Sequence, residues 1–156
     1  MTRFVLDPPI GFEPLVDEPV TPLTQITAPA EAPLVSVVIP ALNESENLPP
    51  LIGEVITALS GRLPFEIIVV DDGSDDSTSD VLNAMIPTTP QLAVYRHRMR
   101  CGQSAAMRTG IKAAKAEWII TIDGDGQNDP ADMPNLIQAR DQARLPAIMV
   151  VGNRVN

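Results

Sequence analysis

Apolar residues recur along the chain in short, nearly continuous runs rich in valine and isoleucine. Runs of this kind predict β-strands at 35–40, 65–71, 92–96, 118–123 and 147–152. The runs lack the alternation of polar and apolar residues that a half-exposed strand shows. We therefore expect both faces of these strands to be covered.

Helical patterns separate the strands. Apolar spacing and local start signals predict helices at 48–61, 77–86, 103–116 and 130–144. The strand ends recur at regular intervals, with a helix after each of the first four strands. Right-handed crossovers then predict an α/β fold, a doubly wound and mainly parallel sheet with helices on both faces.

Residues 1–33 have a different composition from the rest. Prolines recur there among acidic residues, and Arg3 is the only basic side chain. Such a segment has too few apolar side chains to offset its ordering entropy, and its prolines oppose a helix. We expect residues 1–33 to form a Pro-rich, acidic, disordered or extended arm, and residues 34–156 to form the folded domain.

Net charge narrows the possible partners. The 156 residues include 20 acidic and 11 basic side chains, a formal net charge of −9. This balance disfavours nucleic-acid binding, which needs a basic face, and it does not hold anionic lipid by charge alone. Acidic groups can still serve an anionic ligand if a divalent cation lies between them.

Cysteine content and hydropathy point to the cytoplasm. The single cysteine, Cys101, excludes an internal disulfide and fits a reducing compartment. No apolar run approaches the roughly 20 residues needed to span a bilayer. We expect a cytoplasmic protein, with contact to a membrane surface left open.

Polar clusters directly follow three of the predicted strands. They are PALNESEN at 40–47, DDGSDDST at 71–78 and DGDGQNDP at 123–130. In open parallel sheets, ligands bind beyond the carboxyl ends of the strands. We therefore expect the three clusters to lie along one edge of the sheet and to share a crevice.

Helix capping explains part of these clusters. Asn47, Ser77 and Asp129 are placed to cap the helices that follow them. Capping does not explain Asp71 and Asp72, which end an apolar strand, nor the carboxylate pair in the third cluster. Those residues are the candidates for chemistry.

The third cluster offers oxygen ligands at alternate positions, from Asp123, Asp125 and Gln127. An EF-hand beginning at Asp123 is excluded, because its sixth position is Asn128 rather than glycine and its twelfth is Pro134 rather than glutamate. The GxxxxGK[ST] phosphate loop is absent. Carboxylates that leave coordination positions open suit Mg²⁺ or Mn²⁺ bridging the phosphates of a nucleotide.

Four motifs, PALNESEN, VVDDGSDDST, GQSAAMRTGIKAA and IDGDGQNDPAD, together resemble the family 2 glycosyltransferases with a GT-A fold, over residues 34–156. The chain looks most similar to dolichol-phosphate mannosyltransferases and bacterial polyprenyl-phosphate glycosyltransferases. The resemblance implies the nucleotide-binding half of a GT-A fold. It also implies a hexosyltransferase that moves a sugar, with inversion, from a GDP-mannose or UDP-glucose type of donor to polyprenyl or dolichyl phosphate.

The resemblance also implies a set of site residues. The implied nucleotide-binding residues are Pro40, Ala41, Leu42, Asn43, Glu44, Asp71, Asp72, Asp123, Gly124, Asp125 and Gln127. Asp123, Asp125 and Gln127 would hold the Mg²⁺ or Mn²⁺. Asp125 and Arg154 are the implied catalytic residues, Asp125 through the metal and Arg154 by meeting the acceptor phosphate.

The sequence departs from the family at several positions. Leu42 stands where an aromatic residue is common, and Arg100 stands where asparagine is usual. The basic run 96–100 fits a solvated loop as well as it fits a contact with phosphate. His97 has no histidine or cysteine partner for a zinc site, and Cys101 has no base beside it, so neither is assigned a catalytic role.

The chain ends shortly after Arg154, where the family continues with acceptor-binding elements. We therefore expect a fragment with little or no turnover of its own. The full-length protein is expected to lie at the cytoplasmic membrane face through the missing C-terminal part. Two alternatives stay open, the same fold acting on a polysaccharide or cell-wall acceptor, and an inactive nucleotide-diphosphate-binding module.

Overall fold

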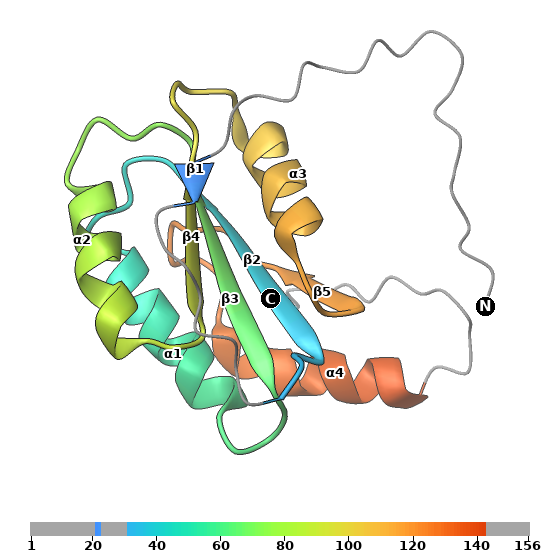
Figure 1. Ribbon diagram of the computed structural model, residues 1–156. Coiled ribbons are helices and arrows are strands. Elements are labelled where there is room, and N and C mark those ends of the chain that lie inside the picture. Colours follow the sequence, from blue (N-terminus) through green and yellow to red (C-terminus); the bar gives the residue numbers. More distant parts are fainter. Residues whose placement is uncertain (1–20, 23–30, 143–156) are drawn as a thin grey trace, which may run out of the picture.

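The computed structural model describes residues 21–22 and 31–142 and contains a five-stranded sheet in the order β1-β4-β3-β2-β5 (Figure 1). The strands β2 to β5 run parallel, whereas β1 pairs antiparallel with β4. This arrangement confirms the predicted, mainly parallel sheet. The bounds are β1 Thr21–Pro22, β2 Val35–Ala41, β3 Phe65–Asp71, β4 Leu92–Arg96 and β5 Trp118–Thr121.

Three predicted features fall wholly or partly outside the described residues. They are the expected strand at 147–152, the segment with Arg154 and most of the N-terminal arm. Within the expected N-terminal arm, the short strand β1 pairs with the carboxyl end of β4. The rest of the arm up to residue 30 lies outside the described residues, so its predicted disorder stays a prediction.

The helices lie where the apolar spacing places them. They are α1 Leu48–Leu59, α2 Thr78–Met85, α3 Gln103–Ala113 and α4 Met133–Gln142, with 3₁₀ turns η1 Ile86–Thr88 and η2 Pro130–Asp132. The helix predicted from residue 130 thus begins as a 3₁₀ turn. Pro49 and Pro50 occupy the first turn of α1, where a missing N–H costs no helical hydrogen bond. Across residues 31–142, the helices are too short or too polar to cross a membrane.

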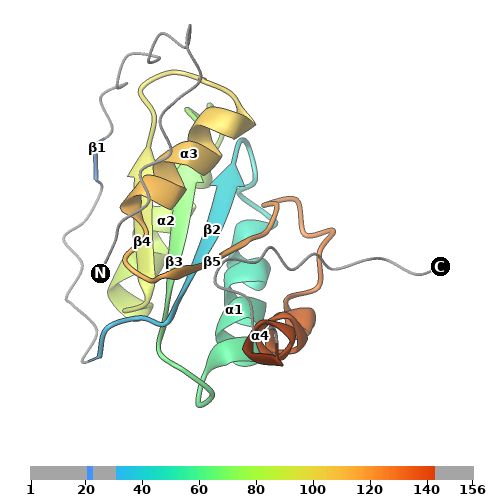
Figure 2. The same ribbon diagram turned by 90° about the vertical axis from the view of Figure 1, so that its right-hand side faces the viewer.

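The chain enters the parallel sheet at a central strand, β2. It moves outward to β3 and β4 through α1 and α2, and α3 then returns it across the sheet to β5 on the other side of β2 (Figures 1 and 2). The neighbouring carboxyl ends of β2 and β5 therefore form a topological switch point. In open α/β sheets, this is where ligands bind.

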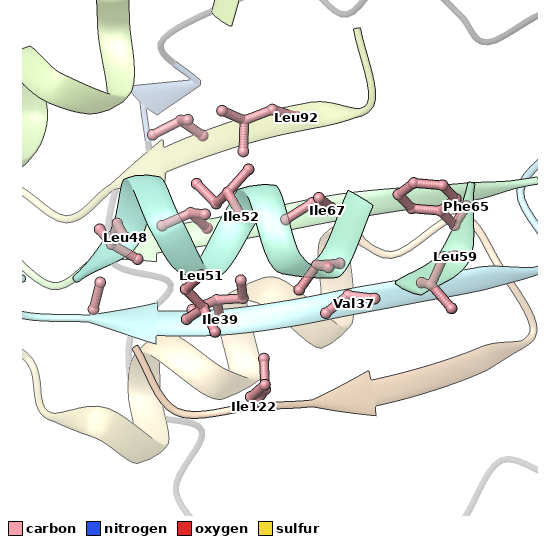
Figure 3. Close-up of a cluster of buried hydrophobic side chains, with 14 of the residues drawn as sticks. Val37, Ile39, Leu48, Leu51, Ile52, Leu59, Phe65, Ile67, Leu92 and Ile122 are labelled. Atoms are coloured by element: carbon pink, nitrogen blue, oxygen red, sulfur yellow. The ribbon is translucent and has the colours of Figure 1, made fainter. Parts of the chain in front are cut away.

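Hydrophobic cores cover both faces of the sheet, as predicted from the unbroken apolar strands. On one face, Leu48, Leu51 and Ile52 of α1 pack over Val37 and Ile39 of β2 (Figure 3). The opposite face packs against α3. Its buried residues are Val38, Ile68, Val70, Ala93 and Ala106.

Helix α3 approaches the sheet closely because Gly110 has no side chain. A Cβ atom at this position would lie 2.4 Å from Cγ1 of Val38 and 3.3 Å from Cγ2 of Val70. Any larger residue there requires the side chain of Val38, the helix or the strand to shift.

A buried polar pair interrupts the apolar strands on the α3 face. The hydroxyl of Ser36 donates to Oε1 of Glu66 over 2.6 Å, and both side chains are buried. The same Glu66 oxygen accepts from the backbone N–H of Lys115, and the Ser36 hydroxyl accepts from that of Ala116. These bonds fix the connection from α3 to β5, which determines where the loop after β5 emerges.

Candidate functional site

The structure brings the three polar clusters together at the carboxyl edge of the sheet. The backbone N–H of Asp72 donates to the carbonyl of Ala41 over 2.8 Å, which joins the first two clusters. The third cluster meets the first at Gly124, where a Cβ atom would lie 3.0 Å from the carbonyl oxygen of Pro40 and 3.6 Å from Cγ of Glu44. The loops after β2 and β5 are therefore in contact at the switch point.

Asn43 joins the loop after β2 to the loop after β3. Its φ of 59° is in the left-handed region, which asparagine tolerates better than most residues. Its side-chain amide donates to Oδ1 of Asp75 over 2.7 Å, and its side-chain carbonyl accepts from the N–H of Asp75 over 3.1 Å. This reciprocal pair gives Asn43 a structural role in shaping the edge.

Asp71 is fully buried and organises the turn that follows β3. Its Oδ1 accepts from the N–H of Ser74 over 2.8 Å, and its Oδ2 accepts from the hydroxyl of Ser79 over 2.5 Å. The guanidinium of Arg96 lies 3.6 Å from Oδ2 and also donates to the hydroxyl of Ser79 and the carbonyl of Ser74. The Asp71 carboxylate thus faces the protein interior.

The capping predicted for Asn47 and Ser77 is wrong. Neither side chain caps its helix, and the Asn47 amide donates to Oε2 of Glu44 instead. At α2, Oδ1 of Asp76 accepts from the N–H of Thr78 over 2.9 Å, while its Oδ2 accepts from Ser45 at 3.4 Å. Asp76, one residue before Ser77 and with a longer side chain, therefore supplies the cap of α2. Asp129 does cap η2, by accepting from Ala131, as predicted.

The pKa of Asp76 lies below its ordinary value of 3.8. Burial acts to raise the pKa, but the hydrogen bonds from Thr78 and Ser45 outweigh it and hold the carboxyl in its charged form. The charged carboxylate therefore contributes to the stability of the fold.

Replacing Asp76 with asparagine is expected to lower stability near neutral pH and to change little in strong acid. A depressed pKa contributes stability above the unfolded value of about 3.8, and this contribution is lost as pH falls through the folded value. Urea unfolding of wild type and of Asp76→Asn should show that the difference in their free energies of unfolding shrinks from about pH 7 to about pH 2. Asp80→Asn is the control, and a pH-independent difference would contradict this account.

Asp72 holds the loop between β4 and α3. Its Oδ1 accepts from the N–H of Cys101 over 2.9 Å and its Oδ2 from the N–H of Gly102 over 2.7 Å. The same Oδ1 lies 2.7 Å from Nδ1 of His97, and both side chains are buried. Nε2 of His97 lies 2.9 Å from the hydroxyl of Thr109.

The basic run after β4 is therefore only partly solvated. Arg96 and His97 contact the turn that begins at Asp71, whereas Arg98, Met99 and Arg100 are exposed. The expectation that His97 has no cysteine partner for a metal site is wrong. Asp72, His97 and Cys101 each offer one atom that could bind a metal, and these three atoms lie within 4.8 Å of one another. The loop turns back on itself, and the three residues between His97 and Cys101 give no sign of this in the sequence.

The loop after β5 presents the predicted oxygen ligands at the surface. Asp123, Asp125 and Gln127 are exposed, and Gly124 between them is buried. Oδ1 of Asp125 accepts from the N–H of Gln127 over 3.0 Å, and Oδ1 of Asp123 accepts from the side-chain amide of Gln103 over 2.8 Å. Strand β5 ends two residues earlier than predicted, although the N–H of Ile122 still donates to Val38.

Comparison with known proteins decides the family. A family model described as "Glycosyl transferase family 2" matches residues 36–156. The chain belongs to glycosyl transferase family 2. The predicted family resemblance is thereby confirmed.

The names of two curated relatives contain a polyprenyl phosphate, and this family 2 chain was compared with both. It is 41% identical over 112 residues to undecaprenyl-phosphate 4-deoxy-4-formamido-L-arabinose transferase of Serratia proteamaculans (strain 568), a match covering 69% of the chain and 34% of the relative. It is 35% identical over 141 residues to dodecaprenyl-phosphate galacturonate synthase of Rhizobium johnstonii (strain DSM 114642 / LMG 32736 / 3841), covering 88% and 40%. The chain thus spans between a third and two fifths of these relatives' length.

Solved glycosyltransferase structures share the fold. The mannosyltransferase PcManGT from Pyrobaculum calidifontis, in complex with GDP-Man and Mn²⁺, matches with a TM-score of 0.54 and 25% identity over 62% of this chain and 28% of that one. S. aureus TarS matches with a TM-score of 0.51 and 23% identity over 69% and 20%. The likeness to TarS shows the fold alone.

Several residues with clear roles at this edge escaped prediction. Ser74 and Ser79 satisfy Asp71, and Gln103 contacts Asp123. A signal for Gln103 was present, because it opens the helix after β4 and therefore lies at the same sheet edge as the other clusters. Applying the post-strand rule to this fourth connection would have found it.

Proposed function

We propose that this chain is the donor-binding part of a glycosyltransferase that transfers a sugar from a GDP- or UDP-linked donor to a polyprenyl phosphate. The contact of Gly124 with Pro40 and Glu44 is the observation that carries the proposal, because it places the carboxylate loop beside the loop after β2 at the switch point. The polyprenyl-phosphate relatives support the acceptor class.

The nucleotide would bind along the edge formed by the three clusters. Pro40, Ala41, Leu42 and Glu44 would contact the base, whereas Asp72, whose carboxylate binds the loop before α3, would act indirectly. For Asp71 and Asn43, we propose an indirect part, since their side chains hold the turns that shape this edge. Asp123, Gly124, Asp125 and Gln127 would lie at the diphosphate.

The oxygen atoms that the loop after β5 presents are suited to bind a hard divalent cation. Oδ2 of Asp123 and Oδ2 of Asp125 accept no hydrogen bond from any residue of the described parts of the chain, and both side chains are exposed. Asp123, Asp125 and Gln127 would hold Mg²⁺ or Mn²⁺ through oxygen. When bound, the cation would neutralise the charge that develops on the leaving diphosphate.

The proposed reaction is a single displacement with inversion. An oxygen of the acceptor phosphate attacks the anomeric carbon of the sugar, and the bond to the nucleoside diphosphate breaks. Because the phosphate is already an anionic nucleophile, no strong general base is required. We propose that Arg154, outside the described residues, positions this phosphate, and that the complete protein works at the cytoplasmic face of a membrane.

Nucleotide binding by this chain is expected to depend on the carboxylate loop. Isothermal titration with GDP and with UDP should show tighter binding in Mn²⁺ than in EDTA for one nucleotide. Asp125→Ala is expected to weaken binding in Mn²⁺ by about tenfold or more, because it removes a proposed ligand. Binding in EDTA should change little.

Asp132→Ala is the matched control, since Asp132 is another exposed carboxylate a few residues along the chain. Failure of both nucleotides to bind the wild-type chain with or without Mn²⁺ would overturn the proposed site. The inactive-module alternative would fall if the chain formed glycosylated polyprenyl phosphate from a nucleotide sugar.

A further inference from the structure

Gln103 is the first residue of α3 and contacts the proposed diphosphate end of the site. Its side-chain amide donates to Oδ1 of Asp123 over 2.8 Å, twenty positions further along the chain. The helix follows β4, but it packs on β2 and β3 on its way to β5. The return of the helix across the sheet is what brings its first turn to the loop after β5.

The backbone on the N-terminal side of Gln103 is held from β3. Gly102 has a φ of 95°, a conformation that suits glycine, and its N–H donates to Asp72. The N–H of Cys101 donates to the same carboxylate. Gly73 completes the attachment, because a Cβ atom there would lie 2.8 Å from the carbonyl carbon of Met99. The start of α3 is therefore fixed against the loop after β3.

His97 fixes the carboxylate that makes these bonds. Its side chain is 2% exposed and lies between Asp72 and Thr109. An ionised carboxylate only accepts hydrogen bonds, so Nδ1 of His97 carries the hydrogen in the contact with Asp72. The Thr109 hydroxyl can donate to or accept from Nε2, so the ring keeps a partner on each side. Asp72 thus has one orientation, set by the ring and by two backbone N–H groups.

We propose that Gln103 is a positioning residue for Asp123, and that the buried pair of Asp72 and His97 holds Gln103 in place. The inference rests on the proposed function. The amide of Gln103 occupies Oδ1 of Asp123 and leaves Oδ2 for the cation. Hydrogen bonds of this kind orient metal-binding carboxylates, and their loss typically costs 10- to 100-fold in metal affinity.

The test compares the gain in nucleotide affinity that Mn²⁺ provides. Titrations of GDP and UDP in Mn²⁺ and in EDTA give this gain as a ratio of dissociation constants. Gln103→Met keeps the length of the side chain and removes the donor, so the gain should fall roughly tenfold while affinity in EDTA stays near that of wild type. Gln103→Asn keeps the amide one methylene short of Asp123 and is expected to behave in the same way.

Two further comparisons separate positioning from a general structural role. Ser104→Ala, at the exposed neighbouring position in α3, should keep the wild-type gain. His97→Ala should lower the gain, whereas His97→Asn, whose amide can replace Nδ1 as a donor to Asp72, should restore much of it. Thermal unfolding of each variant shows whether the fold is retained.

The outcomes distinguish this inference from the function on which it rests. A wild-type chain that binds neither nucleotide would overturn both. A wild-type gain that is unchanged in Gln103→Met and Gln103→Asn would overturn the positioning role and leave the donor site standing. Equal losses in Mn²⁺ and in EDTA would show general damage to the edge and would also overturn it.

Discussion

Replacing Asp71 with alanine is expected to lower the free energy of unfolding by about 1–3 kcal/mol, the range observed when buried hydrogen-bond donors lose their acceptor. The carboxylate is fully buried and accepts from Ser74 and Ser79, with the Arg96 guanidinium beside it. Its removal would leave the N–H of Ser74 and the hydroxyl of Ser79, both on buried residues, without their acceptor. The turn after β3 would then lose its main internal contact.

Urea unfolding followed by the fluorescence of Trp118, the only tryptophan, measures this loss. Asp75→Ala is the matched control, because Asp75 is an exposed carboxylate in the same turn. It is expected to cost much less, although it breaks the pair with Asn43. Equal effects of the two substitutions would show that burial and the charged network around Asp71 contribute little.

Alanine at Gly110 is expected to destabilise the fold, whereas alanine at Gly53 is expected to stabilise it slightly. Both glycines lie inside helices, so both substitutions gain up to about 1 kcal/mol of helix propensity. A Cβ atom at Gly53 meets no atom within 4 Å, but one at Gly110 would lie 2.4 Å from Val38. The difference between the two variants isolates the overpacking cost, about 1–3 kcal/mol.

Chemical denaturation of the two glycine variants beside wild type gives this difference directly. If Gly110→Ala were as stable as Gly53→Ala, α3 would be able to move away from β2 at no cost. The close packing of the helix would then have no energetic importance. The position of Gln103 at the start of the same helix would also be less firmly set.

The sheet could be predicted from the sequence because each strand is marked by a short apolar run of its own residues. Runs such as VSVVIP and FEIIVVD are mostly apolar on both faces, with Ser36 and Glu66 as polar interruptions on the α3 face, and the crossovers have one favoured hand. The meeting of the loops after β2 and β5 followed from that topology. The contact between Gly124 and Pro40 agrees with it.

The side-chain partners at the edge could not be predicted, because they depend on how loops turn back in space. By its neighbours in sequence, His97 belongs to a basic run that fits a solvated loop as well as a contact with phosphate, yet it is buried against the carboxylate of Asp72. Likewise, Asp76 rather than Ser77 supplies the cap of α2, because the longer side chain reaches the Thr78 N–H. The local sequence does not indicate which hydrogen-bond partner a loop side chain will contact.

The short strand β5 has a consequence for how the candidate site loses its structure. It has four residues, its side chains are half-buried or exposed, and within the described part of the chain it pairs with β2 alone. A strand held in this way opens locally at a lower free energy than the central strands do. The proposed cation ligands would then separate from the loop after β2 while β2, β3 and β4 remain folded. Ligand affinity and global stability can therefore change independently in this protein.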